Sequence, residues 1–94
     1  MEFAALIIVD NHAEDPEAGR RGLRDELLPA LRSMPGFIDA RLLTDYDRGR
    51  GVALVVFEAR AQAETLAESV KPGMQIREGV TVVSSEVLEV TVAS

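Results

Sequence analysis

The chain has 94 residues, of which 47% are hydrophobic and 28% are charged, and its formal net charge is −6 at pH 7. The hydrophobic fraction is sufficient for a folded core and excludes a disordered chain. The negative charge argues against nucleic acid and anionic membranes as partners, because both are themselves negatively charged. With no cysteine and a single histidine, the chain lacks a disulfide, a thiolate nucleophile and the usual ligands of a zinc site.

The first expected element is a strand over residues 3–9. These residues form a continuous apolar run rich in β-branched side chains, which is typical of a strand buried on both faces. The run is too short to span a bilayer, and the acidic Glu2 departs from the basic start of a signal peptide. We therefore expect a soluble, cytoplasmic protein without a membrane partner.

Residues 15–34 are expected to form an amphipathic helix. Asp15 followed by Pro16 is typical of a helix start, where the aspartate caps the first turn. Apolar residues recur at helical spacing and form one stripe, which consists of Leu23, Leu27, Leu31 and Met34. Pro29 lies inside this helix and predicts a kink, because proline has no backbone N–H to donate. Residues 35–36, a Pro-Gly pair, end the helix.

Two strands are expected next, over residues 37–46 and 52–57. The segment between them, residues 45–51, is dense in Asp and Gly and therefore predicts a turn. The second of these strands is apolar on both faces, like residues 3–9. The short connection makes an antiparallel hairpin the simplest pairing of the two strands.

A second helix is expected over residues 59–70, where several alanines would let it lie close to a sheet. A Lys-Pro-Gly sequence at residues 71–73 ends this helix. Residues 80–92 predict a final strand, whose apolar side chains change face near Ser84. This change predicts a bulge, or a change of pairing partner, at that point.

The order strand, helix, strand, strand, helix, strand predicts a ferredoxin-like α+β fold over residues 1–94 as a single domain. In this fold a four-stranded antiparallel sheet carries both helices on one face. Two helices leave the other face uncovered, yet the first and third strands are apolar on both faces. A large apolar surface in water is rare in monomers. We therefore expect a homodimer in which two sheets pack face to face.

The sequence also resembles a known family. The segments that carry the resemblance are residues 27–37 (LLPALRSMPGF), residues 51–58 (GVALVVFE) and residues 87–94. They are similar to the dimeric α/β-barrel superfamily, and within it to the small antibiotic-biosynthesis-monooxygenase-like proteins. The resemblance implies a barrel that closes between two copies of the chain, with a cavity in its interior.

The resemblance also implies which chemistry is absent. The superfamily includes cofactor-free monooxygenases and haem-degrading enzymes. The haem-degrading branch uses an Asn on the first strand, a Trp on the second helix and a His further along that helix. This chain has Ile7 and Leu66 at the first two positions and no histidine after His12. Haem degradation is therefore disfavoured, and we expect no cofactor and no metal.

Three charged or titratable residues are candidates for a catalytic role. His12 follows the first strand and is the side chain whose ordinary pKa lies closest to neutral pH, so it could act as a general base or a hydrogen-bond donor. The alternative is a solvated histidine in a loop. Asp39 and Arg41 share the strand face that would point into the barrel, where Arg41 could hold a carboxylate or phenolate. The alternative is a solvated pair, or a salt bridge between two copies.

Three further residues are candidates for substrate binding: Asn11, Phe37 and Tyr46. Asn11 lies beside His12, and Tyr46 lies at the expected hairpin turn. Tyr46 could donate a hydrogen bond to a ligand, or it could pack at the surface with its hydroxyl group in water. Phe37 could line a pocket or belong to the core.

Two function classes follow from these observations. The first is a cofactor-free, monooxygenase-like enzyme that acts on a small apolar or aromatic substrate in the barrel. The second is a non-catalytic dimeric module that binds a small ligand or serves only as a structural partner. The shortage of His, Trp, Tyr and Cys favours the second class, whereas the resemblance favours the first. The sequence leaves open whether the protein is an enzyme.

Overall fold

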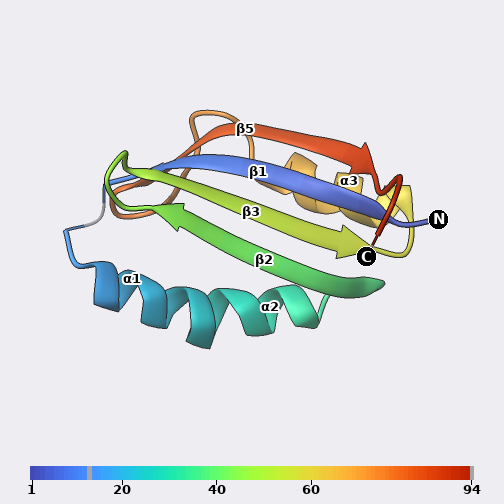
Figure 1. Ribbon diagram of the computed structural model, residues 1–94, viewed down its shortest axis with the longest axis horizontal. Coiled ribbons are helices and arrows are strands. Elements are labelled where there is room, and N and C mark those ends of the chain that lie inside the picture. Colours follow the sequence, from blue (N-terminus) through green and yellow to red (C-terminus); the bar gives the residue numbers. More distant parts are fainter. Residues whose placement is uncertain (13, 94) are drawn as a thin grey trace.

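The computed structural model describes residues 1–12 and 14–93, and Figure 1 shows its ribbon. The elements are β1 (Phe3–Asn11), α1 (Pro16–Gly22), the π-helical segment η1 (Leu23–Leu27), α2 (Leu28–Arg32), β2 (Phe37–Asp45), β3 (Arg50–Phe57), α3 (Arg60–Ser69), β4 (Gln75–Arg77) and β5 (Val80–Glu89). The expected βαββαβ order is confirmed, with the short strand β4 as an addition.

The strands form one antiparallel sheet with the order β2-β3-β1-β5-β4. The described residues thus form five strands in place of the expected four. The additional strand β4 pairs with the start of β5, where Gln75 lies opposite Thr81 and Arg77 lies opposite Val80. The sequence does not predict β4, because three residues of mixed polarity are too few to show a periodic pattern.

The helices cover one face of the sheet, as expected. In Figure 1, α3 lies behind β1 and β5, and the helical segment from α1 to α2 runs along the β2 side. The core lies between these layers and consists of Ala5, Ile7, Leu31, Val55, Phe57, Ala63, Leu66 and Val82. Every second residue of β1 and β3 points into it, as the strand period of two requires. None of the described helices is long and apolar enough to cross a membrane.

The helix expected over residues 15–34 forms as three consecutive segments. Asp15 caps α1, because its side chain accepts hydrogen bonds from two backbone N–H groups of the first turn. The irregularity is η1, where the N–H of Leu28 donates to the carbonyl of Leu23, five residues earlier. Pro29 follows directly and has no N–H to donate. The helix is therefore interrupted at the place where the sequence predicts a kink.

The turn between α2 and β2 depends on Gly36, whose φ of +77° lies in the left-handed region. A Cβ atom at this position would overlap the side-chain oxygen of Gln62. That oxygen accepts a hydrogen bond from the N–H of Ala59 at 3.1 Å, and the carbonyl of Gly36 accepts one from Glu58 at 2.9 Å. These contacts join the turn that follows α2 to the start of α3.

The bulge expected near Ser84 is confirmed. Ser84 lies opposite Ile8 and Val82 lies opposite Val9, which leaves Val83 as the extra residue of β5. The strand ends at Glu89, three residues earlier than expected. Residues 90–93 turn across one end of the sheet (Figure 1).

Candidate functional site

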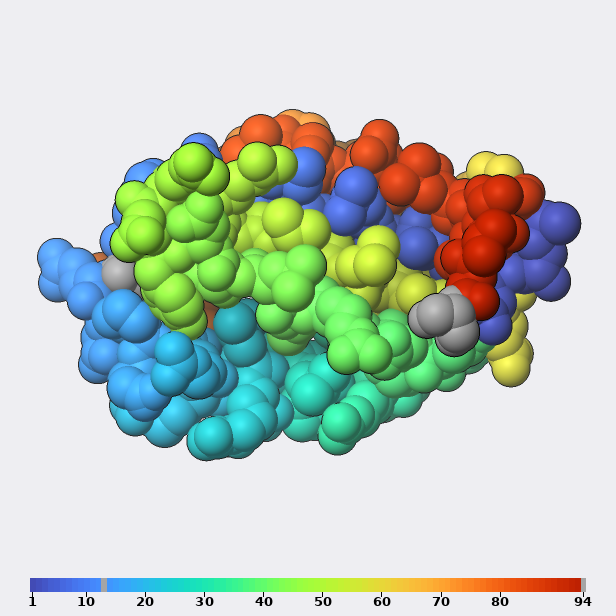
Figure 2. All heavy atoms as spheres, in the orientation of Figure 1, coloured from blue at the N-terminus to red at the C-terminus, as the bar shows by residue number. Residues whose placement is uncertain are grey.

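The open face of the sheet, which the helices leave uncovered, is the first candidate surface, and Figure 2 shows it from strand to strand. Pairing across the strands places residues of this face in rows. One row, from β2 to β5, consists of Arg41, Leu54, Leu6 and Glu86. The adjacent row consists of Leu43, Val52, Ile8 and Ser84. The open face is therefore aliphatic at its centre, and Arg41, Glu86 and Ser84 are the polar residues that end these two rows.

The arginines of the open face have acidic neighbours. Arg50 lies between Asp10 and Asp45 in the register of the three strands. Arg41 forms an ion pair with Asp39 at 3.4 Å, and the two side chains are 73% and 53% exposed. Exposed pairs of this kind contribute little to stability, so both arginines can exchange their acidic neighbours for another anion at small cost.

A cavity on the opposite side of the sheet is the second candidate. It lies between the sheet and the segment formed by α1 and η1, has a volume of about 830 Å³ and is open to solvent. Neither α1 nor η1 contains a buried residue. Leu42 and Ala53 point to this side of the sheet but are only partly buried. The first helical turns therefore stand off the sheet and leave space beneath them.

Two arginines connect α1 to the sheet side of this cavity. Arg20 donates a hydrogen bond to the hydroxyl of Tyr46 at 3.4 Å, and its guanidinium carbon lies 5.8 Å from the centre of the tyrosine ring. The hydrogen bond to Tyr46 is the main cause that raises the pKa of Arg20, with Glu17 contributing less. From β4, Arg77 donates to the carbonyl of Gly19 at 3.4 Å. Polar contacts thus hold α1 in place here.

The structure divides the predicted site residues among three places. Asn11, His12 and Tyr46 line the same end of the cavity, because the end of β1 adjoins the turn between β2 and β3. Asp39 and Arg41 lie on the open face. Phe37 packs edge to face against Phe57 in the core, with ring centres 6.5 Å apart.

The predicted catalytic residues therefore do not meet in one site. His12 is exposed and lies against the backbone of Gly49. Arg20 and Arg77, which the sequence analysis did not single out, are more closely placed around the cavity. Within residues 1–12 and 14–93, no three His, Cys, Asp or Glu side chains are grouped so as to hold a metal ion.

No protein-family model and no curated protein matches this sequence. Its fold is found in solved structures, among them two RRM domains. The second RRM domain of the yeast poly(U)-binding protein Pub1 is 15% identical, with a TM-score of 0.52, over 92% of this chain and 94% of that domain. The C-terminal RRM domain of MEC-8 bound to AGCACA is 23% identical, with a TM-score of 0.53, over 98% of each chain. The chain therefore has the fold of RRM (RNA recognition motif) domains.

These matches correct the expectations that rested on the family resemblance. The matching proteins are RRM domains, so the resemblance to antibiotic-biosynthesis-monooxygenase-like proteins is wrong. The monooxygenase-like function and its alternative, a dimeric ligand-binding or structural module, are wrong with it. The ferredoxin-like arrangement is confirmed, but the structure does not show a dimeric barrel. The βαββαβ order and strands that are apolar on both faces occur in more than one family, so these features do not identify the family.

The expected partners are corrected by the same finding. The sequence predicted a second copy of the chain and a small ligand inside the barrel that two copies would form, with nucleic acid excluded on the grounds of net charge. The MEC-8 domain has the same fold and is bound to AGCACA. A net charge of −6 is a property of the whole chain and does not exclude local cations: on the open face Arg41 and Arg50 are present, each beside acidic side chains.

Proposed function

We propose that this protein is a cytoplasmic module that binds single-stranded RNA on the open face of its sheet. One observation carries the proposal: the chain shares its fold, over 98% of both chains, with an RRM domain that is bound to AGCACA. RRM domains present a sheet on which bases lie. In this chain the corresponding face is free of helices (Figure 1), and Leu6 and Leu54 are paired at its centre.

The contacts available on the open face determine how RNA would bind. Leu6 and Leu54 lie side by side in the central row, and both are partly exposed. The described phenylalanines point to the helix side or into the core, so bases would lie on aliphatic side chains in place of aromatic rings. Arg41 and Arg50 are the cations that would contact phosphate groups.

This composition predicts weak binding. Two phosphate contacts give a salt dependence with a slope of about −1.4 on logarithmic axes, since each contact on a single strand contributes about −0.7. Affinity would then fall about sevenfold between 50 and 200 mM salt. Without aromatic stacking, we expect a dissociation constant of about 10⁻⁴ M, the weak end of sequence-independent binding.

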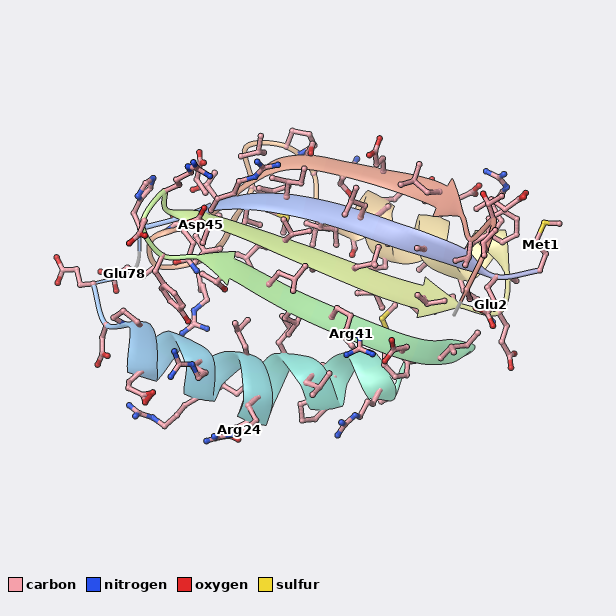
Figure 3. The ribbon with its side chains drawn as sticks, in the orientation of Figure 1. Met1, Glu2, Arg24, Arg41, Asp45 and Glu78 are labelled. Carbon is pink, nitrogen blue, oxygen red and sulfur yellow. The ribbon has the colours of Figure 1, made fainter. Side chains whose placement is uncertain are left out.

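The test is a titration of the isotope-labelled protein with AGCACA RNA, followed by backbone amide shifts in NMR spectra. We expect shifts to concentrate around Leu6, Leu54 and Arg41. The variant Arg41→Ala should weaken these shifts. Its control is Arg24→Ala, which also removes one positive charge, but on the outer side of the first helical segment, where Figure 3 places Arg24 away from the sheet. Like Arg41, Arg24 is exposed and paired with a neighbouring aspartate, Asp25, at 2.9 Å.

Two results would contradict the proposal. One is the absence of saturable shifts at millimolar RNA. The other is a particle mass near twice 10.2 kDa by light scattering, with open-face amides protected and unaffected by RNA. In that case a second copy of the chain would occupy the surface that the proposal assigns to RNA.

A further inference from the structure

The cavity beneath α1 has the walls of a binding site for an apolar group. Its inner lining comes from both layers and includes Ile7, Leu23, Leu27, Leu42, Ala53 and Val55. A volume of about 830 Å³ is within the range of sites that bind small organic molecules. Contact between water and such apolar walls is unfavourable, and a ligand with an apolar body would remove this contact by covering the walls.

Arg77 gives this cavity a charged end. Its guanidinium lies against Gly22 of α1, where a Cβ atom would come within 2.6 Å of Nη1. The absence of a side chain at Gly22 therefore makes the room that the guanidinium occupies. Arg77 is only partly exposed, and its guanidinium donates a hydrogen bond to the carbonyl of Gly19.

Arg77 differs from the other arginines around the cavity in its lack of an acidic partner. Arg20 is paired with Glu17, and Arg48 with Asp45. Arg77 forms no ion pair with any residue in the described ranges 1–12 and 14–93. A guanidinium has five N–H donors in a planar arrangement that matches a carboxylate, so most of the hydrogen-bonding capacity of Arg77 is available to a ligand.

The helical irregularity lies at the same place. Leu23 and Leu27, which line the cavity, are the first and last residues of η1. Single π-helical turns are found frequently at functional sites, because they displace the side chains of one face relative to a regular helix. Here the π-helical segment separates α1, which stands off the sheet, from α2, which contributes Leu31 to the core.

We propose that this cavity binds an amphipathic carboxylate, with the carboxylate group on Arg77 and the apolar body between η1 and the sheet. A bidentate contact with the guanidinium fixes the charged end, and burial of the chain supplies the remaining affinity. The site lies on the face of the sheet opposite to the proposed RNA surface and does not depend on that proposal.

The experiment compares three ten-carbon probes that differ at one end: decanoate, decanol and decylamine. Binding to the purified protein is measured by isothermal titration calorimetry, below the concentrations at which the probes aggregate. We expect decanoate to bind at least tenfold more tightly than decanol, and decylamine to bind most weakly. In Arg77→Gln, decanoate should fall to the affinity of decanol, whereas decanol should be unchanged. Arg24→Gln is the matched control and should bind all three probes like the wild type.

A second variant tests the position of the apolar body. Ala53→Phe adds a large side chain to the cavity wall and should abolish binding of both decanoate and decanol. The proposal is overturned if decanoate does not saturate the protein, if decanoate and decanol bind equally, or if Arg77→Gln leaves the preference for decanoate intact. Should Arg77→Gln fail to fold, the order of the three probes on the wild-type protein still decides, since it needs no variant.

Discussion

A single aromatic side chain on the open face should strengthen RNA binding strongly. Leu54 lies at the centre of this face, between Arg41 of β2 and Leu6 of β1. We predict that Leu54→Tyr tightens the binding of AGCACA about 5- to 150-fold, because stacking of one base on an aromatic ring contributes about 1–3 kcal/mol. The variant should fold, since Leu54 is partly exposed and tyrosine is favoured in strands. Fluorescence anisotropy with labelled RNA at constant salt measures the change.

The control for this prediction is Met74→Tyr, which adds the same side chain at an exposed apolar position before β4. It should leave RNA affinity unchanged, because Met74 does not belong to the rows of the open face. A folded Leu54→Tyr protein that binds RNA no more tightly than the wild type would refute the reasoning, since bases would then not lie over β3.

Three further predictions concern charge, core and turn. Arg41→Ala should reduce the salt slope of RNA binding by about 0.7, whereas Arg24→Ala should not change it; equal slopes in both variants would contradict a phosphate contact at Arg41. Phe57→Ala should lower the free energy of unfolding by about 3–5 kcal/mol, because Phe57 is fully buried at the centre of the core. Urea denaturation measures this loss, and a loss below about 1 kcal/mol would mean that the core is not built around this ring. Gly36→Ala should cost about 1–3 kcal/mol and displace Gln62, which thermal unfolding detects; an unchanged melting temperature would contradict the tight turn.

Most of the fold follows from local sequence patterns. The strand over residues 3–9, the capped helix that begins after Asp15 and the hairpin around residues 45–51 all form as predicted, because each depends on neighbours in the chain. The bulge at Val83 was visible as a change of hydrophobic phase. By contrast, β4 consists of three residues whose strand conformation results from pairing with β5, a tertiary contact that their own sequence does not encode.

The proposed function is harder to predict from the sequence, because it depends on what covers the sheet. Leu6, Leu54 and Val56 show correctly that the second face is apolar, but their sequence does not say whether a second sheet or RNA lies on it. The cavity was missed for a related reason. Gly22 makes room for Arg77, which is distant in the sequence, and no local pattern shows that the two residues meet.

The two proposed sites can be distinguished because they use alternate residues of the same strands. Leu54 points to the open face, and its neighbours Ala53 and Val55 line the cavity on the other side. No residue that carries one proposal carries the other, so variants on opposite faces should act additively. Leu54→Tyr should therefore leave decanoate affinity unchanged, and Arg77→Gln should leave RNA affinity unchanged. If either variant altered both affinities, RNA binding and decanoate binding would be coupled. Each ligand would then change the affinity for the other by the same factor, and the two sites could not be treated as independent.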